Sequence, residues 1–400
     1  MSSGGIWHAL VGQDEVVDQL RHAVDDAERR TRGEDGPAMT HAWLFTGPPG
    51  SGRSTAAVSF ATALICPERG CGVCQVCRTA PLGGHPDVDI VRPEGLTYGV
   101  DDAKALIAQA NLSPSGSHWH VIVLEDADRL TEQAANMLLK EIEEPPAHTV
   151  WVLCAPSVED VLPTIVSRVR HTGLRTPSTA DVAELLVERY AVDRAMAAFA
   201  ARASQGHIGR ARALATDEHA RLRRQEVLRI PLQLHDIPAC FAHAANLLDA
   251  ATEDAAAITD PLDAVEAEQL DASFGAGGEV RIKGQLKRSY DAAVKAMKQR
   301  QKTRSTRTVR DQIDRALLDL VGLYRDVLIL QVDSDQALIN EEMRPQLAQL
   351  AANATANDTG RRLRAITYAR AQVQSNVTPL IALESLMVEL KDPWIRSATA

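Results

Sequence analysis

Short apolar runs alternate with helix-spaced apolar positions along the first 173 residues. The runs at 42–45, 121–124 and 150–154 are apolar throughout, as expected for strands buried on both faces of a sheet. Between the last two, residues 134–142 repeat apolar side chains with helical spacing, after a candidate N-cap at Thr131. Strands that alternate with helices at this distance predict a parallel α/β sheet across residues 7–173.

Beyond residue 175 the strand pattern stops, and helical periodicity predicts a small domain at 176–217 and a larger one at 218–400. An acidic, alanine-rich segment followed by glycines, at about 249–280, is predicted to be a linker or a mobile insertion. The next 30 residues, 281–310, are basic with Asp291 as their only acid. That stretch is either a helix that contacts phosphates or a solvated face paired with the acidic segment.

Composition narrows the function classes. The 400 residues carry a net charge of −10, which argues against general coating of nucleic acid but leaves room for a local basic surface. No apolar run is long enough to span a bilayer, and the first residues lack the basic and apolar parts of a signal peptide. We therefore expect a cytoplasmic protein.

The stretch between the 42–45 strand and the following helix has the form of a phosphate-binding loop. A glycine-rich turn between a strand and a helix lets successive N–H groups point at one anion. The candidate nucleotide-binding residues of this loop are Gly47, Gly50, Gly52, Arg53, Ser54 and Thr55. The usual lysine is Arg53, whose planar guanidinium is not equivalent to a compact ammonium. ATP and Mg²⁺ binding is therefore possible here, but hydrolysis is doubtful.

Glu125 and Asp126 follow the strand at 121–124. Acidic residues at the carboxyl end of a buried parallel strand, beside a phosphate-binding loop, are where Mg²⁺ and an attacking water are held. The order is reversed here, since Asp precedes Glu in the usual pair. The alternative is a solvated acidic turn without a ligand.

Four cysteines lie within twelve residues, with the spacing C-x4-C-x2-C-x2-C. Such a cluster in a cytosolic chain favours metal thiolates over disulfides, and four sulfurs close a tetrahedral Zn²⁺ site of structural type. Iron–sulfur proteins also use short spacings, so the metal stays an inference. The candidate ligands are Cys66, Cys71, Cys74 and Cys77.

Several motifs in one order resemble the bacterial clamp-loader family of AAA+ proteins. They are His41–Gly50, the four-cysteine cluster, His85-Pro86-Asp87, Ala135–Lys140 with Glu143–Pro146, and Thr164–Arg168. The resemblance is strong to about residue 215 and reaches the last helix through Asn376–Pro379, but it leaves out about 245–310. It implies an α/β AAA+ P-loop domain with a zinc knuckle (1–175), a helical lid (176–217) and an all-α collar (218–400).

Within that family, the gamma/tau-type ATPases keep the P-loop lysine, whereas the delta-prime type has a degenerate nucleotide site. Three departures place this chain with the delta-prime type: Arg53, the reversed Glu125-Asp126, and apolar Ala155-Pro156 where the family has its polar sensor-1 residue. The resemblance implies that Arg168 is an arginine finger for the ATP site of a neighbouring ATPase subunit. Arg210 matches the sensor-2 arginine, which touches a nucleotide bound in its own chain.

The implied partners are the gamma/tau ATPase subunits and the delta subunit of a clamp loader, the sliding clamp (beta), and primer-template DNA reached through the complex. DNA polymerase III is the enzyme that such a complex serves. Two alternatives stay open: an ATP-hydrolysing gamma/tau-type subunit, and a zinc-containing DNA-binding protein that uses residues 281–310.

Overall fold

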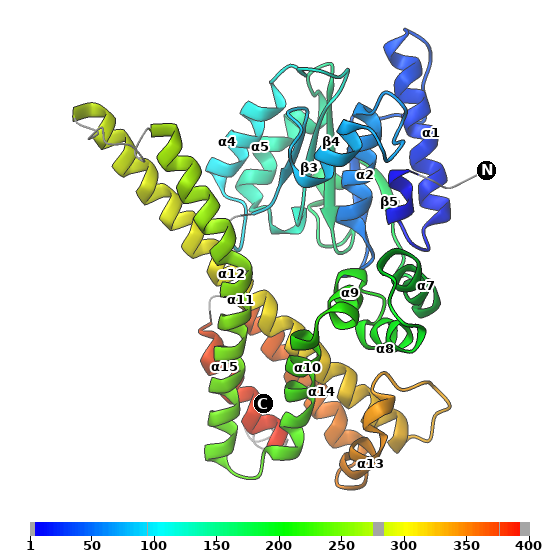
Figure 1. The fold of residues 1–400 in the computed structure, drawn as a ribbon, viewed down its shortest axis with the longest axis vertical. Coiled ribbons are helices and arrows are strands. Elements are labelled where there is room, and N and C mark those ends of the chain that lie inside the picture. Colours follow the sequence, from blue (N-terminus) through cyan, green and yellow to red (C-terminus); the bar gives the residue numbers. More distant parts are fainter. Residues whose placement is uncertain (1–4, 94, 275–283, 376, 393–400) are drawn as a thin grey trace. The chain divides into compact units, whose positions relative to one another are not determined.

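A computed structural model describes residues 5–93, 95–274, 284–375 and 377–392. The chain divides into two compact units, residues 1–216 and 217–400. The first unit holds the sheet and the helices that follow it, and the second is built from helices (Figure 1). The division into sheet domain, lid and collar at 175 and 217 stays a prediction.

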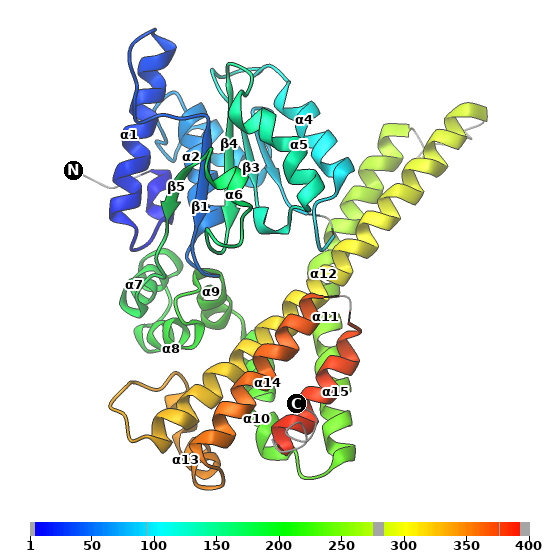
Figure 2. The same cartoon turned by 180° about the vertical axis from the view of Figure 1, so that it is seen from behind.

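A five-stranded parallel sheet forms the centre of the first unit. Its spatial order is β2-β3-β4-β1-β5, so the P-loop strand β1 lies between β4 and β5 (Figure 2). The strands are β1 (Ala42–Thr46), β2 (Val88–Val91), β3 (His120–Leu124), β4 (Thr149–Ala155) and β5 (Arg170–Gly173). The predicted parallel α/β sheet is confirmed.

Alternate side chains of the central strands enter two separate cores. In β1, Trp43 and Phe45 join one apolar cluster, whereas Leu44 joins the cluster on the opposite face. Because successive side chains point to opposite faces of a strand, an all-apolar run suits a sheet covered on both sides. This is the physical reason that the three apolar runs predicted the buried strands.

Helices cover both faces of the sheet (Figure 1). One face carries α1 (Asp14–Thr31) and α2 (Arg53–Ile65), and the other carries α4 (Val100–Ala110) and α5 (Glu132–Glu143). The Thr131 hydroxyl accepts a hydrogen bond from the Ala134 N–H and so caps α5, as predicted. Shorter elements complete this part: η1 (Ile6–Ala9), α3 (Gln75–Thr79), η2 (Ala80–Leu82), η3 (Ala127–Arg129) and α6 (Pro163–Val166).

Three helices, α7 (Thr179–Tyr190), α8 (Arg194–Ser204) and α9 (Ile208–Thr216), follow the sheet in the same unit. They enclose a small core made mostly of alanines with Val182, Leu186 and Leu214. Ser178 and Asp181 form a capping box at the start of α7. We call these helices the lid.

The second unit is an all-helical assembly around its own apolar core. Its elements are α10 (Glu218–Gln233), α11 (Ile237–Phe274), α12 (Gly284–Gln331), η4 (Glu341–Met343), α13 (Arg344–Ala352), α14 (Ala356–Gln374) and α15 (Pro379–Lys391). A buried polar network crosses it: Arg224, with its side chain 4% exposed, pairs with Asp319 at 3.0 Å. In α15, Leu383, Met387 and Leu390 are buried in this core.

The expectation of a linker or mobile insertion at 249–280 is wrong for residues 249–274. These residues continue α11, which runs beside α12 as a long antiparallel pair (Figures 1 and 2). Alanine has the highest helix propensity, and the acidic side chains find cations on α12, for instance Glu266 at 2.5 Å from Arg304. Residues 275–280 of the proposed insertion, 281–283 of the basic stretch and Asn376 of the collar motif lie outside the described residues.

Candidate functional site

The P-loop connects β1 to α2 in the conformation that its glycines predict. Gly50 and Gly52 have φ angles of +91° and +85°, in the left-handed region that favours glycine. Gly52 is the N-cap of α2 and leaves the first N–H groups of that helix without a side-chain cap. Ser54 and Thr55 lie in the first turn of α2. The backbone of the loop is therefore shaped to receive an anion.

The guanidinium of Arg53 bonds within the loop itself. Its Nη1 donates to the Gly47 carbonyl at 2.8 Å, and its Nη2 lies 3.7 Å from Asp126 Oδ1. The Arg53 side chain is 16% exposed, and that of Asp126 is 20% exposed. The cation at the lysine position thus bridges the start of the P-loop and the acidic turn after β3.

Glu125 forms an ion pair with Arg92, which the sequence did not predict. Arg92, which follows β2, donates Nε and Nη2 to the two carboxylate oxygens at 2.8 and 3.0 Å. This fork geometry is the strong form of an arginine–carboxylate pair. Both carboxylates of the predicted pair are therefore paired with arginines, which compete with Mg²⁺ or a water for the carboxylate oxygens.

The residues at the predicted sensor-1 position, Ala155 and Pro156, carry no polar side chain. Ala155 is the buried last residue of β4, opposite Thr46 in the sheet register. The Pro156 carbonyl accepts a hydrogen bond from the Gly47 N–H at 3.1 Å. The backbone after β4 thus braces the P-loop, but no side chain there is able to orient a water.

The lid packs directly on the P-loop. A Cβ added to Gly50 would lie 2.6 Å from the Cα of His207, closer than real side-chain contacts come. The Nδ1 of His207 accepts from the Arg210 N–H at 3.3 Å, in the first turn of α9. Arg210 is half-buried. The structure thus brings α9, which carries the predicted sensor-2 residue Arg210, to the P-loop through His207.

Arg168 lies at the opposite edge of the sheet from the P-loop. In the parallel β1–β5 pair Trp43 faces Arg170, so Arg168 precedes the pair, whereas Gly47 follows its far end. At a rise of 3.3 Å per residue the two are separated by roughly 15–20 Å along the strands. Arg168 therefore does not join Arg53, Glu125 and the other predicted nucleotide residues in its own chain.

The Arg168 side chain is exposed and held in place. Its Nε donates to Glu143 Oε2 at 3.0 Å, and its Nη1 donates to the Thr164 carbonyl at 2.9 Å and to the Ser167 hydroxyl at 3.1 Å. The guanidinium is thus oriented from the end of α5 and from α6. Val169 packs against the apolar core on one face of the sheet.

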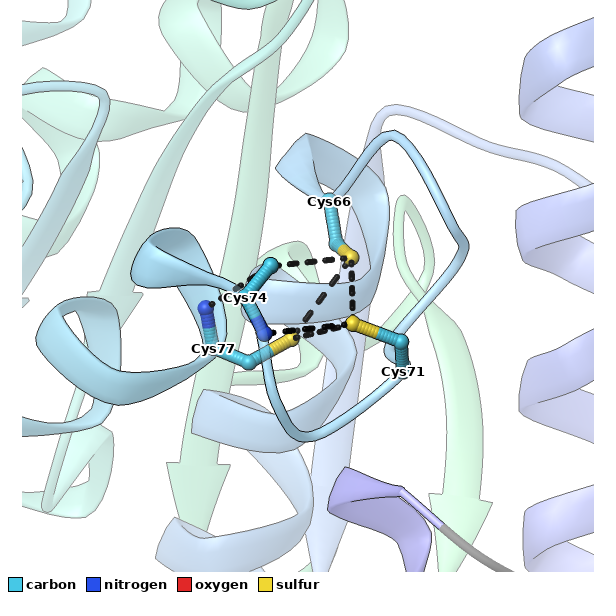
Figure 3. Close-up of side chains that lie close together, drawn as sticks. All are labelled: Cys66, Cys71, Cys74 and Cys77. Atoms are coloured by element: carbon cyan, nitrogen blue, oxygen red, sulfur yellow. Dashed lines mark hydrogen bonds between the residues drawn. The ribbon is translucent and has the colours of Figure 1, made fainter.

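The four cysteines converge on one point (Figure 3). Cys66 caps the end of α2, and the other three come from the following loop and from α3. Sulfur–sulfur distances are 4.0 Å for Cys66–Cys71, 3.7 Å for Cys66–Cys74, 3.5 Å for Cys66–Cys77 and 4.0 Å for Cys71–Cys77. A tetrahedron with Zn–S bonds of 2.3 Å has edges of about 3.8 Å, so the sulfur set matches Zn²⁺.

Backbone amides support the thiolate character of the cluster. The N–H groups of Val73 and Cys74 lower the pKa of Cys71 to about 7, whereas burial raises the pKa of Cys77. The four cysteines are free of disulfides. A group of four thiols closed around one point would hold a structural metal, and it leaves no open position for chemistry.

A protein-family model described as DNA polymerase III, delta subunit, matches residues 32–178. Residues 32–178 are therefore similar to subunits of DNA polymerase III. This matched domain contains the P-loop, the cysteine cluster and Arg168. The chain has relatives of both subunit types. It is 33% identical over 171 residues to DNA polymerase III subunit gamma/tau of Mycobacterium tuberculosis (strain ATCC 25618 / H37Rv). It is 32% identical over 154 residues to DNA polymerase III subunit delta' of Bacillus subtilis (strain 168).

A third relative, DNA polymerase III subunit delta' of Escherichia coli (strain K12), is 32% identical over 180 residues. The three alignments cover 42%, 38% and 44% of this chain and 28%, 47% and 54% of the respective relatives. The chain thus spans about half or less of the relatives it matches. Across the described ranges, no helix combines the length and apolar character needed to cross a membrane.

Sequence reasoning missed three residues that shape this site: Arg92, Glu143 and His207. Arg92 gives no local signal, because its partner Glu125 lies 33 positions away. Glu143 was quoted within a family motif without a role, and the structure gives it one as the partner of Arg168. His207 lies within the predicted 176–217 domain, but its contact with Gly50 depends on how the lid packs.

Proposed function

We propose that this chain is a delta-prime-type stator subunit of a DNA polymerase III clamp loader. In this role it hydrolyses no ATP of its own and supplies Arg168 to the ATP site of an adjacent gamma/tau-type subunit. The delta subunit, the sliding clamp and primed DNA complete the assembly, which works in the bacterial cytoplasm. Zn²⁺ on Cys66, Cys71, Cys74 and Cys77 would fix the loop after α2.

The main support for the proposal is that the residues expected to act in hydrolysis already have partners within the chain. Arg53 donates a hydrogen bond to Gly47 and forms an ion pair with Asp126, and Glu125 accepts hydrogen bonds from Arg92. Phosphoryl transfer needs a free cation at the phosphates and a carboxylate free for metal or water. The P-loop backbone remains suited to phosphate, so nucleotide binding without turnover is compatible with this role.

The position of Arg168 supports action in trans. Its own P-loop is out of reach across the sheet, while its side chain is exposed and preset by Glu143. An arginine finger neutralises charge that develops on the γ-phosphate and is worth 10³–10⁵ in rate. The ATPase rate of a complete loader should therefore depend on Arg168.

The test compares DNA- and clamp-stimulated ATP hydrolysis by the reconstituted loader with wild-type chain, Arg168→Ala, Arg168→Lys and Arg53→Ala. We expect Arg168→Ala and Arg168→Lys to lower the rate at least 100-fold. Arg53→Ala is the matched control for loss of one arginine and should leave the rate within about twofold. Equal assembly of all four complexes, checked by gel filtration, separates catalysis from binding. A large loss with Arg53→Ala alone would reject the stator role.

A gamma/tau-type ATPase is the second candidate. The gamma/tau and delta' relatives have nearly the same sequence identity to this chain, 33% and 32%. Arg210 is also present at the predicted sensor-2 position. Phosphate release by the isolated chain distinguishes the two functions. Turnover that Arg53→Ala abolishes would favour the ATPase.

A further inference from the structure

The N-terminal half of α12 carries five exposed cations on one face. They are Lys287, Arg288, Lys295, Lys298 and Lys302, and we call them the basic stripe. At 3.6 residues per turn the five positions fall within a sector of about 100° and extend over about 22 Å of helix. Asp291 is the one acidic residue in that sector.

Other cations of the basic stretch 281–310 have partners within the second unit, whereas the stripe residues do not pair with acids in the described part of that unit. Arg304 contacts Asp263 and Glu266 of α11, and Arg310 donates to the Ser375 carbonyl at 2.7 Å. Among the described residues, by contrast, the five stripe cations have no acidic partner within ion-pair distance. The solvated-face interpretation thus accounts for the C-terminal part of the stretch and leaves the stripe unexplained.

The α11–α12 pair holds the stripe on a rigid support. Gln301 donates to the Asp263 carbonyl at 3.1 Å, and the Tyr290 hydroxyl donates to Asp271 at 2.6 Å. The Tyr290 ring also packs against Phe274, with centroids 5.5 Å apart. These contacts and buried Met297 define the inward faces of α12, and the stripe lies on a different face.

We propose that the basic stripe binds the phosphate backbone of duplex DNA, independently of base sequence and of Arg168. Phosphate neutralisation by lysine and arginine provides most of the affinity of such contacts. The stripe contains no aromatic side chain, which disfavours base stacking with single strands. The nearby Tyr290 contacts Asp271 and Phe274 of α11 instead. It also lacks the apolar residues that an interfacial membrane helix inserts. A length of about 22 Å matches six to seven base pairs of duplex.

The test measures binding of the full chain to a fluorescent 30-base-pair duplex of arbitrary sequence between 50 and 200 mM salt. Five phosphate contacts predict a salt slope of about −4.5, so the wild-type affinity should fall about 500-fold over this range. In the variant Lys287→Gln/Lys295→Gln/Lys298→Gln/Lys302→Gln the slope should shrink to about −0.9, a loss of only three- to fourfold. Glutamine preserves helix propensity, and circular dichroism checks the fold.

The matched control changes four exposed arginines outside the stripe to glutamine: Arg194, Arg229, Arg315 and Arg364. Both variants change the net charge from −10 to −14, so a difference between them reports position and not total charge. The control should keep a slope within about one unit of wild type. Equal slopes for the two variants, no duplex binding at 50 mM salt, or tighter binding to phosphatidylserine vesicles than to duplex would each overturn the proposal.

Discussion

Asp87 provides a quantitative test of how the parallel sheet of the first unit is held together. Its carboxylate is 1% exposed just before β2 and accepts four hydrogen bonds from the loop that leads into β3. The donors are the Ser115 N–H and hydroxyl at 2.6 and 2.9 Å, the Gly116 N–H at 3.0 Å and the Ser117 N–H at 2.9 Å. Burial raises the pKa of Asp87, but these bonds outweigh it and lower the pKa from 3.8 to about 2.

The depressed pKa converts into stability. A shift from 3.8 to about 2 corresponds to about 2 kcal/mol of unfolding free energy, at 1.36 kcal/mol per unit. Because the folded-state pKa is the lower one, this contribution is complete well above pH 4 and is lost as the pH falls towards 2. About 1 kcal/mol of it should disappear between pH 5 and pH 3.

Asp87→Asn removes the charge and replaces one acceptor by a donor that faces N–H groups. We expect the free energy of unfolding to fall by at least about 2 kcal/mol at pH 7, and the deficit against wild type to shrink by about 1 kcal/mol from pH 5 to pH 3. Urea unfolding followed by tryptophan fluorescence measures this, because Trp7, Trp43, Trp119 and Trp151, four of the five tryptophans, lie in the first unit.

The matched control is Asp101→Asn, which removes a carboxylate that is 96% exposed and pairs with Lys104 on the surface. Its effect should stay within about 0.5 kcal/mol at every pH, as for other exposed ion pairs. If Asp87→Asn instead lowers stability by the same amount at pH 5 and pH 3, the carboxylate charge is not the source of the stabilisation.

Three further predictions concern the other parts of the chain. The protein should bind one Zn²⁺, Cys71→Ser should abolish that stoichiometry in a colorimetric zinc assay, and Cys154→Ala should retain it, because Cys154 is buried outside the cluster. Arg53→Lys should give no measurable phosphate release by the isolated chain, since Glu125 stays paired with Arg92; turnover would contradict our account of the site. Arg304→Gln should speed hydrogen exchange in residues 249–274 by about fivefold, equivalent to about 1 kcal/mol, and unchanged exchange would mean that this ion pair does not hold α11.

The parts that the sequence predicted well are those fixed by local pattern. An all-apolar run such as Val121–Leu124 suffices to predict a strand covered on both faces, and the cysteine spacing suffices to predict convergence of four sulfurs. The glycine pattern of the P-loop likewise predicted a turn between a strand and a helix, and Gly50 and Gly52 have positive φ in that turn. In each case the determining contacts lie within a dozen residues or repeat with a fixed period.

The parts that it missed depend on pairs distant in sequence. The acidic residues of segment 249–274, considered alone, predict a linker, yet the segment is helical and its Asp263 and Glu266 pair with Arg304 about 40 positions later. Arg92 and Glu125 are 33 positions apart and meet only because β2 and β3 pair in register. The spacing of Arg92 and Glu125 along the chain forms no motif, so the sequence did not predict the pair.

These distant pairs change what the motif residues are able to do. The sequence predicted a weakened nucleotide site from three substitutions, and the structure adds that Arg53 and Glu125 each have a partner within the chain. Arg168 also has a partner, Glu143, but the pair is exposed at the other edge of the sheet. The fold thus pairs Arg53 and Glu125 within the chain and exposes the oriented guanidinium of Arg168, which is the arrangement that the proposed role in a neighbouring subunit requires.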